Sequence, residues 1–173
     1  MNHSKQTNHL FQAAQHGDVT TIRKTLASLP ELANTENQDG LTPLGYASHY
    51  GQAGAVRLLL EYGADVNALS HSKISFIPSN TALHAAFAGE RSPEVIELLL
   101  EHGACTSILD SDGQNVLHSA AFHTDQIELI QLLLQHDADP NAENSAGETA
   151  LDIAITRGNR ATAAYLRDAI ATK

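Results

Sequence analysis

Histidine and cysteine are the side chains of this sequence best suited to metal binding, acid–base chemistry or nucleophilic attack. The chain of 173 residues has ten His and a single Cys. No two His are four residues apart and no mixed His and Cys cluster occurs, so the spacing of zinc ligands is missing. Cys105 ends the segment EHGAC, and the similar segments EYGAD and QHDAD end in Asp65 and Asp139. This comparison favours a small turn residue over a thiolate nucleophile. His49 and His123 could bridge a metal only from separate predicted helices, and we expect no metal, no cofactor and no catalytic residue.

The charge balance limits the partners of this protein. Ten Lys and Arg stand against twenty Asp and Glu, which gives a formal net charge of −10. Nucleic-acid phosphates and anionic membrane surfaces repel such a protein. The N-terminal stretch MNHSKQTNHL lacks the apolar segment of a secretory signal, and no apolar run is long enough to span a membrane. We therefore expect a soluble, cytoplasmic, monomeric protein that binds neither nucleic acid nor membrane.

Three Leu triplets reveal an internal repeat that must position any functional side chains. The triplets lie at 58–60, 98–100 and 132–134, and each precedes a polar turn (EYGAD, EHGAC and QHDAD). A second marker recurs at intervals of 33, 40 and 34 residues, at Asn34, Asn67, Ser107 and Asn141. This spacing predicts a unit of 33 residues, with a six-residue insertion in one loop and one extra residue in each of two later units.

Each unit is predicted to contain two short helices joined by polar, turn-like segments. The first helix is rich in small residues (LHAA) and the second in branched apolar residues (VIELLL). Ser92 and Asp125 have the pattern of N-caps for second helices. Gly63 and Gly103 are expected to end second helices in the left-handed conformation, with Asp137 as a weaker stop.

These features resemble those of the ankyrin repeat family. Residues 39–68, DGLTPLGYASHYGQAGAVRLLLEYGADVNA, are similar to a near-complete ankyrin repeat, and residues 10–36 resemble a divergent first repeat. The resemblance implies an all-α ankyrin-repeat solenoid of stacked helix-turn-helix units with β-hairpin-like finger loops. Gly45, Asn115 and Asp152 depart from the TPLH tetrapeptide of the family, and we expect each to lose a turn hydrogen bond. We expect a single domain, 1–173, with approximate repeats at 7–38, 39–68, 80–109, 110–145 and 146–173 and a six-residue finger insertion within 69–79.

The resemblance also implies a protein-binding scaffold that uses its finger loops and the concave face of its first helices. Aromatic and large apolar residues dominate interface energetics, so Tyr50, Phe122 and Leu41 are the foremost candidates. For Phe87 and Phe122, packing between neighbouring repeats is an equally good explanation. The acidic fingers favour a partner with a basic surface patch. The expected partner-binding residues are Leu41, His49, Tyr50, Ile74, Phe76, Ile77, Phe87, Arg91, Asp112, Phe122, His123 and Arg157.

The insertion HSKISFIPS, residues 71–79, is more apolar than the other fingers. Such a loop either folds back on the stack or reaches for a partner. We favour the second, because fingers face solvent and exposed apolar patches usually mark contact sites.

Two other functions remain open beside a non-catalytic protein–protein interaction module that regulates or inhibits its partner. Ankyrin repeats similar to LEYGADVN can be substrates of an asparaginyl hydroxylase, which makes Asn67 and Asn141 possible modification sites. An enzyme that uses the concave face is the weaker alternative. No GxxxxGK[ST], GxGxxG, GxSxG or HExxH motif is present to support it, so we expect no enzymatic activity.

Overall fold

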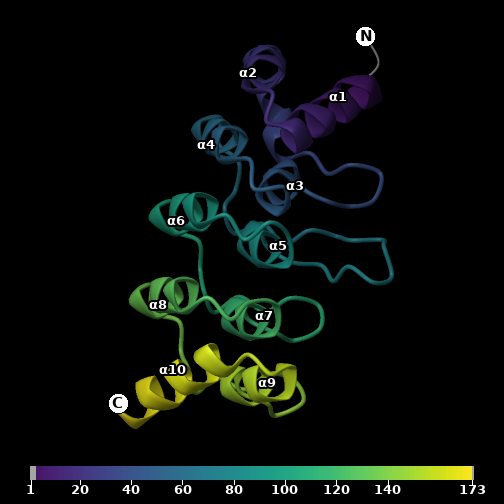
Figure 1. Cartoon of the computed structure of the whole chain (residues 1–173). Helices are drawn as coiled ribbons and strands as arrows, with labels where there is room; N and C mark the ends of the chain where they lie inside the picture. The colour runs from purple at the N-terminus through teal and green to yellow at the C-terminus, as the bar shows by residue number, and fades with distance from the viewer. Residues whose placement is uncertain (1–2, 173) are drawn as a thin grey trace. The chain divides into compact units, whose positions relative to one another are not determined.

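The computed structural model describes residues 3–172, and the regular elements in that range are helices (Figure 1). The predicted all-α fold of paired helices is thereby confirmed. Two residues at the start of the chain and the last residue of the predicted fifth repeat lie outside the described range. The chain forms two compact units, Met1–Ala104 (unit 1) and Cys105–Lys173 (unit 2).

Unit 1 contains three helix pairs. Its first helices pack in one row, with α3 against α1 and α5, and its second helices pack in another, with α4 against α2 and α6 (Figure 1). A 3-10 helix, Pro30–Asn34, follows α2. The first helices are α1 (His3–His16), α3 (Pro43–His49) and α5 (Ala82–Ala88), and the second helices are α2 (Val19–Ser28), α4 (Ala53–Glu61) and α6 (Pro93–Glu101).

Unit 2 contains two further pairs with the same arrangement. The first helices α7 (Val116–His123) and α9 (Ala150–Arg157) pack against each other, and the second helices α8 (Ile127–Gln135) and α10 (Arg160–Ala171) do likewise. Among the residues that the structure describes, strand-like pairing is limited to an isolated antiparallel bridge between Glu143 and Thr149. The predicted hairpin-like loops are therefore turns with very little β structure.

The Leu triplets lie at the centre of the core. Leu59, Leu99 and Leu133, the middle residue of each triplet, are fully buried. Ala47 and Ala86 on the first helices are also fully buried, and their small side chains allow α3 and α5 to pack closely. Burial of the branched side chains is the main stabilising term that the repeats provide.

The predicted ends of the second helices are largely confirmed. Ser92 caps α6 by accepting a hydrogen bond from the backbone of Val95. Gly63 and Gly103 adopt the left-handed conformation, with φ of 81° and 85°, and Asp137 adopts it as a non-glycine residue with φ of 62°. The left-handed geometry at all three positions explains why the polar turn begins abruptly after each triplet.

Asp125 does not have its predicted role as the N-cap of α8. The helix is preceded by Gln126, whose side chain makes no capping hydrogen bond. The Oδ1 atom of Asp125 instead accepts a hydrogen bond at 2.8 Å from the backbone N–H of Thr162 in α10. The prediction was wrong because the Asp125 carboxylate bonds to the backbone of α10 in the next helix pair and not to the backbone of α8.

Two of the three departures from TPLH retain a turn hydrogen bond. Asn115 Oδ1 accepts from the N–H of His118 at 3.0 Å, and the Asn115 N–H donates to His118 Nδ1 at 3.2 Å. Asp152 Oδ2 accepts from the N–H and the hydroxyl of Thr149 at 2.9 and 2.7 Å. Both substitutes supply acceptor atoms of suitable reach, so the expected loss was wrong for these two positions. Gly45 has no side chain with which to replace the bond.

Candidate protein-binding surfaces

Three of the four finger loops, all but residues 69–79, turn by the same pair of hydrogen bonds, which the sequence analysis did not identify. In the first finger (residues 35–42), Asn37 Oδ1 accepts from the N–H groups of Asp39 and Leu41, both at 3.0 Å. Asp110 and Asn144 make the equivalent pairs of bonds in the fingers at 107–114 and 141–148. These turns could have been predicted from an Asn or Asp three residues before a Gly, because Asn and Asp side chains accept hydrogen bonds from their own backbone in turns.

The second finger (residues 69–79) is anchored on the first. His71 N–H donates to the carbonyl of Gly40, and Lys73 N–H donates to the carbonyl of Asp39, both at 2.9 Å. The His71 side chain lies 2.8 Å from a carboxylate oxygen of Glu36. The base of the insertion therefore folds back onto the neighbouring finger.

The tip of the second finger presents apolar side chains to solvent. Phe76 is 82% exposed, while Ile74 and Ile77 are half-buried and joined by a backbone hydrogen bond of 3.0 Å. Leaving a phenyl ring in water is unfavourable for the isolated chain. The insertion thus has a packed base and an exposed tip, and contact between the tip and a partner stays a prediction.

An aromatic cluster covers part of the first-helix row of unit 1. The ring of Tyr46 meets those of Phe11 and Tyr50, with centroids 5.2 and 5.1 Å apart, and Tyr50 meets His49 at 5.1 Å. Burial and a hydrogen bond with Tyr50 raise the pKa of Tyr46, so the Tyr46 phenol is neutral at physiological pH. The sequence analysis found Tyr50 and His49 but missed Tyr46, although its position four residues before Tyr50 places both on one helix face.

Phe87 has to be removed from the expected contact residues. Its side chain is fully buried within unit 1, so it packs in the core and offers no surface to a partner. Leu41, Tyr50 and Arg91 are half-buried, and His49 is exposed. The carbonyl of His49 accepts a hydrogen bond from the backbone of Glu90 at 2.9 Å, which links α3 to the loop after α5.

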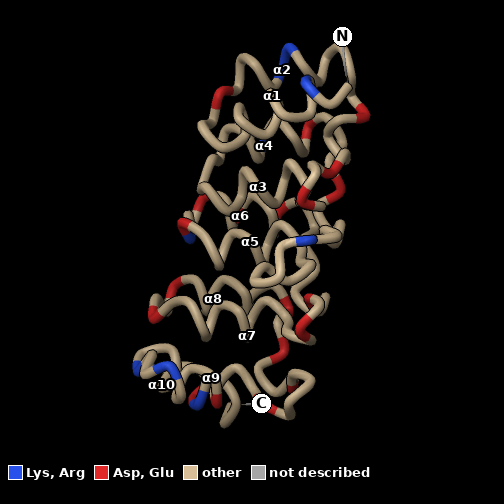
Figure 2. The backbone as a smooth tube through the Cα atoms, turned by 90° about the vertical axis from the view of Figure 1, so that its right-hand side faces the viewer, with Lys and Arg blue, Asp and Glu red and all other residues tan. Residues whose placement is uncertain are grey.

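Unit 2 brings together three other expected residues. The guanidinium of Arg157 lies over the ring of Phe122 at 4.0 Å from its centroid, and the His123 ring meets Phe122 edge-on at 4.9 Å. Asp112 is exposed in its finger, and its backbone carbonyl accepts from the Ser145 hydroxyl at 2.9 Å. Figure 2 shows Asp and Glu spread along both units, and those in the fingers are Glu36, Asp39, Asp110, Asp112, Glu143 and Glu148.

The two possible modification sites differ in their surroundings. The side-chain amide of Asn67 is half-buried and donates to the carbonyl of Gly103 at 3.0 Å. Asn34 makes the same bond to Gly63 at 2.8 Å one repeat earlier. Asn141 is exposed. Hydroxylation of either residue stays a prediction, and an enzyme that acts on Asn67 would first have to break its turn bond.

His118 links two turns of unit 2 through a buried imidazole. Its Nε2 lies 3.0 and 3.1 Å from the carbonyls of Ala142 and Glu148. Burial lowers the pKa of His118, and these backbone hydrogen bonds only partly oppose that shift. Charging this imidazole is therefore more costly in the folded chain than in the unfolded one.

We expect this shift to make the folded state less stable in mild acid. The unfolded chain takes up the proton at a higher pH than the folded one, so stability falls as pH drops below about 6.5 toward the lowered pKa. Urea titrations between pH 7.5 and 5 will show this slope. His118→Gln should reduce the dependence of stability on pH. The control His136→Gln, at an exposed histidine, should have the same pH dependence as the wild type. An equal slope in wild type and His118→Gln would contradict the assignment.

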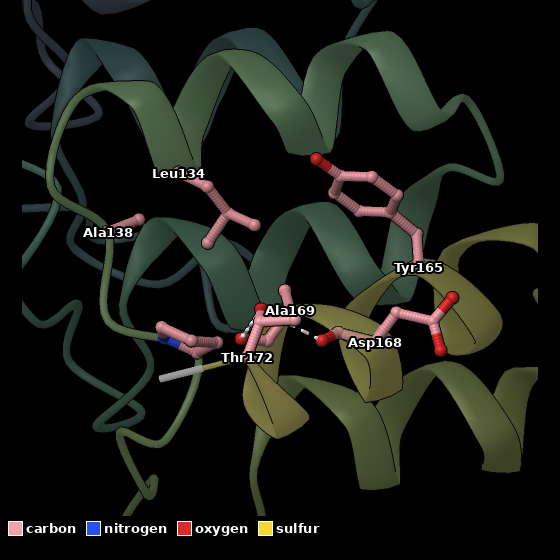
Figure 3. A pocket seen from close by; sticks show the side chains of 7 residues that line it. Leu134, Ala138, Tyr165, Asp168, Ala169 and Thr172 are labelled. Atoms are coloured by element: carbon pink, nitrogen blue, oxygen red, sulfur yellow. Dashed lines mark hydrogen bonds between the residues drawn. The ribbon is translucent and has the colours of Figure 1, made fainter.

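A pocket of about 400 Å³ lies between α8 and α10 (Figure 3). Leu134 and Tyr165 contribute its larger side chains, and the Thr172 hydroxyl is bonded to the carbonyls of Asp168 and Ala169. None of the contact residues expected from the sequence lines this pocket. It is open and mostly apolar.

Within residues 3–172, no group of three or more His, Cys, Asp or Glu is arranged to hold a metal ion. In the same range, none of the helices has the length and apolar character needed to cross a membrane. Cys105 is exposed, and a hydrogen bond with Ser107 lowers the pKa of its thiol.

Within each unit the first helices and the second helices pack in separate rows, and three of the four fingers turn at an Asx residue, an arrangement that defines a helical repeat protein. Residues 1–70, 69–144 and 106–172 match the family model described as ankyrin repeats (3 copies), so the chain belongs to the ankyrin repeat family. The expected resemblance is confirmed. Repeats of this family are in general protein–protein interaction modules, and the family is typically non-catalytic.

Several curated proteins are similar to this chain over part of their length. It is 38% identical over 113 residues to the serine/threonine-protein kinase VIK of Arabidopsis thaliana, which covers 65% of this chain and 23% of the relative. It is 32% identical over 120 residues to the palmitoyltransferase akr1 of Neurospora crassa, and this match covers 69% of this chain and 16% of the relative. A putative ankyrin repeat protein of fowlpox virus, FPV031, is 40% identical over 86 residues, covering 50% and 24%. The chain thus spans less than a quarter of each of these relatives.

Proposed function

We propose that this chain binds a partner protein through the first two fingers and the first-helix row of unit 1, together with the corresponding face of unit 2. The observation that carries the proposal is the exposed Phe76 on a finger whose base is held by the backbone of the first finger. A fixed base keeps the exposed ring in place before the partner arrives, which lowers the entropic cost of binding.

The aromatic cluster of unit 1 supplies a second anchor. Tyr50 is held between Tyr46 and His49 and remains half-buried. Ordered tyrosines with part of the ring in solvent are frequent hot spots, because they bury much apolar area and lose little conformational entropy. Leu41 and Arg91, which are both half-buried, complete the proposed contact set of unit 1.

The acidic fingers favour a partner with a basic surface patch. Opposite charges at exposed positions act chiefly on the association rate, and salt weakens their effect. Binding of this kind regulates or inhibits the partner when it covers the working surface of that protein. A cytoplasmic monomer remains our expectation for the chain.

Affinity capture with the immobilised chain, from a lysate of the source organism, tests the proposal. We expect Tyr50→Ala and Phe76→Ser each to lower recovery of the captured protein at least about tenfold, since hot-spot truncations cost about 2 kcal/mol or more. Tyr62→Ala is the matched control, because Tyr62 is also half-buried but ends the second helix α4. Equal losses in Tyr50→Ala and Tyr62→Ala, or none in either, would contradict the proposed surface.

A further inference from the structure

The Arg157 side chain at the end of α9 has an aromatic support but no acidic partner. Its guanidinium stacks on Phe122, which is 41% exposed, and His123 borders the same ring. In the described range 3–172, no carboxylate lies within 4.0 Å of Arg157 and its guanidinium donates no hydrogen bond. A guanidinium has five N–H donors in a planar fork, so binding capacity remains here.

Among the described residues, Arg157 has no ion pair although unit 2 is rich in acidic residues. Unit 2 contains four Lys and Arg against ten Asp and Glu. The acid on the same helix, Asp152, is directed to the backbone and hydroxyl of Thr149, and these bonds lower the pKa of its carboxyl group. The Asp152 carboxylate is therefore already used in capping α9.

We propose that Phe122, His123 and Arg157 form a carboxylate-binding subsite for a partner segment that carries Glu or Asp beside an apolar residue. Stacking on Phe122 holds the guanidinium plane, so less side-chain freedom is lost when a carboxylate binds it bidentately. The apolar neighbour covers the part of the Phe122 ring that faces solvent. The acidic surroundings repel a dianionic phosphate more than a singly charged carboxylate.

This inference rests on the proposed function and names one feature of the partner. The acidic fingers favour a basic patch, whereas this subsite requires an acidic side chain. The two requirements concern different residues of the partner. They can therefore be tested separately.

Titration of short peptides into isotope-labelled protein, followed by NMR, tests the subsite. The probes are acetyl-Leu-Glu-Leu-amide, its Gln isostere and the same peptide with phosphoserine in place of Glu. We expect the Glu peptide to shift the Arg157 Nε–H and Phe122 ring signals and to bind at least fivefold more tightly than the Gln peptide. A phosphoserine peptide that binds more tightly than the Glu peptide would overturn the choice of carboxylate.

Substitutions show whether the preference for Glu belongs to Arg157. In Arg157→Gln the Glu and Gln peptides should bind equally, and Phe122→Leu should reduce the preference because it removes the aromatic support. Arg160→Gln, a nearby exposed cation on α10, should keep the full preference. A preference that survives in Arg157→Gln, or that falls equally in Arg160→Gln, would overturn the proposal.

The peptide result and the capture experiment fail independently. No preference for Glu combined with partner loss in Tyr50→Ala would reject the subsite alone. A preserved preference with no effect of Tyr50→Ala would reject the proposed surface of unit 1 and leave the subsite standing. Protein spectra and melting curves of each variant check that the fold is retained.

Discussion

Replacing Leu99 by Ala is expected to lower the free energy of unfolding by about 2–5 kcal/mol, because a fully buried side chain is removed and a cavity is left. Leu99 lies in α6, which packs against α4 and α5. Each helix pair of a repeat protein is stabilised chiefly by its neighbours, so a cavity there weakens both contacts of α6. The measurement is the shift of the urea unfolding midpoint.

Leu69→Ala provides the matched control for this experiment. Leu69 belongs to the same unit but is exposed, at 44%. The same loss of atoms should therefore change stability by no more than about 0.5 kcal/mol. Equal midpoint shifts in Leu99→Ala and Leu69→Ala would show that the triplets do not form the core.

The second large effect is expected from Gly40→Ala at the junction of the first two fingers. Gly40 has a φ of 75°, and a Cβ atom there would collide with the backbone carbonyl of His71. The collision would separate the fingers and break the hydrogen bonds that His71 and Lys73 donate to the first finger. We expect a loss of about 2–4 kcal/mol, in the upper range of single substitutions.

Gly63→Ala separates the collision from backbone strain alone. Gly63 has a similar φ of 81°, but nothing lies within 4 Å of the added Cβ. The left-handed conformation costs a non-glycine residue about 1–2 kcal/mol, and Gly63→Ala should lose only that. Hydrogen exchange of the Lys73 amide should rise in Gly40→Ala and not in Gly63→Ala. A loss no greater in Gly40→Ala than in Gly63→Ala would refute the anchored second finger.

The sequence was sufficient to predict the helix pairs, because apolar spacing and glycine positions follow directly from the geometry of a helix and its end. The triplet centre Leu59 and the left-handed Gly63 are both where the pattern placed them. Asp125 was misassigned because its partner, Thr162, lies 37 residues away. Local capping patterns carry no information about such a distant donor.

The candidate surfaces could be predicted only in part. Phe87 lies six residues after the N-cap of α5 and Phe122 seven after the N-cap of α7, so their side chains differ by about 100° around the helix axis. Phe87 is accordingly fully buried and Phe122 is 41% exposed, a difference that alignment of the two repeats could have predicted. The stacking of Arg157 on Phe122 joins two repeats, and a pattern of residue types does not specify it. Tyr46, by contrast, could have been found from its helical spacing to Tyr50.

Hydrogen exchange of the protein with and without its captured partner tests the central claim most directly. If the proposed surface of unit 1 is correct, partner binding will slow exchange at amides of the first two fingers, 35–42 and 69–79, and of α3. Amides of the second helices α4 and α6 will exchange at unchanged rates. Slowed exchange in α4 and α6 with none in the fingers would contradict the account.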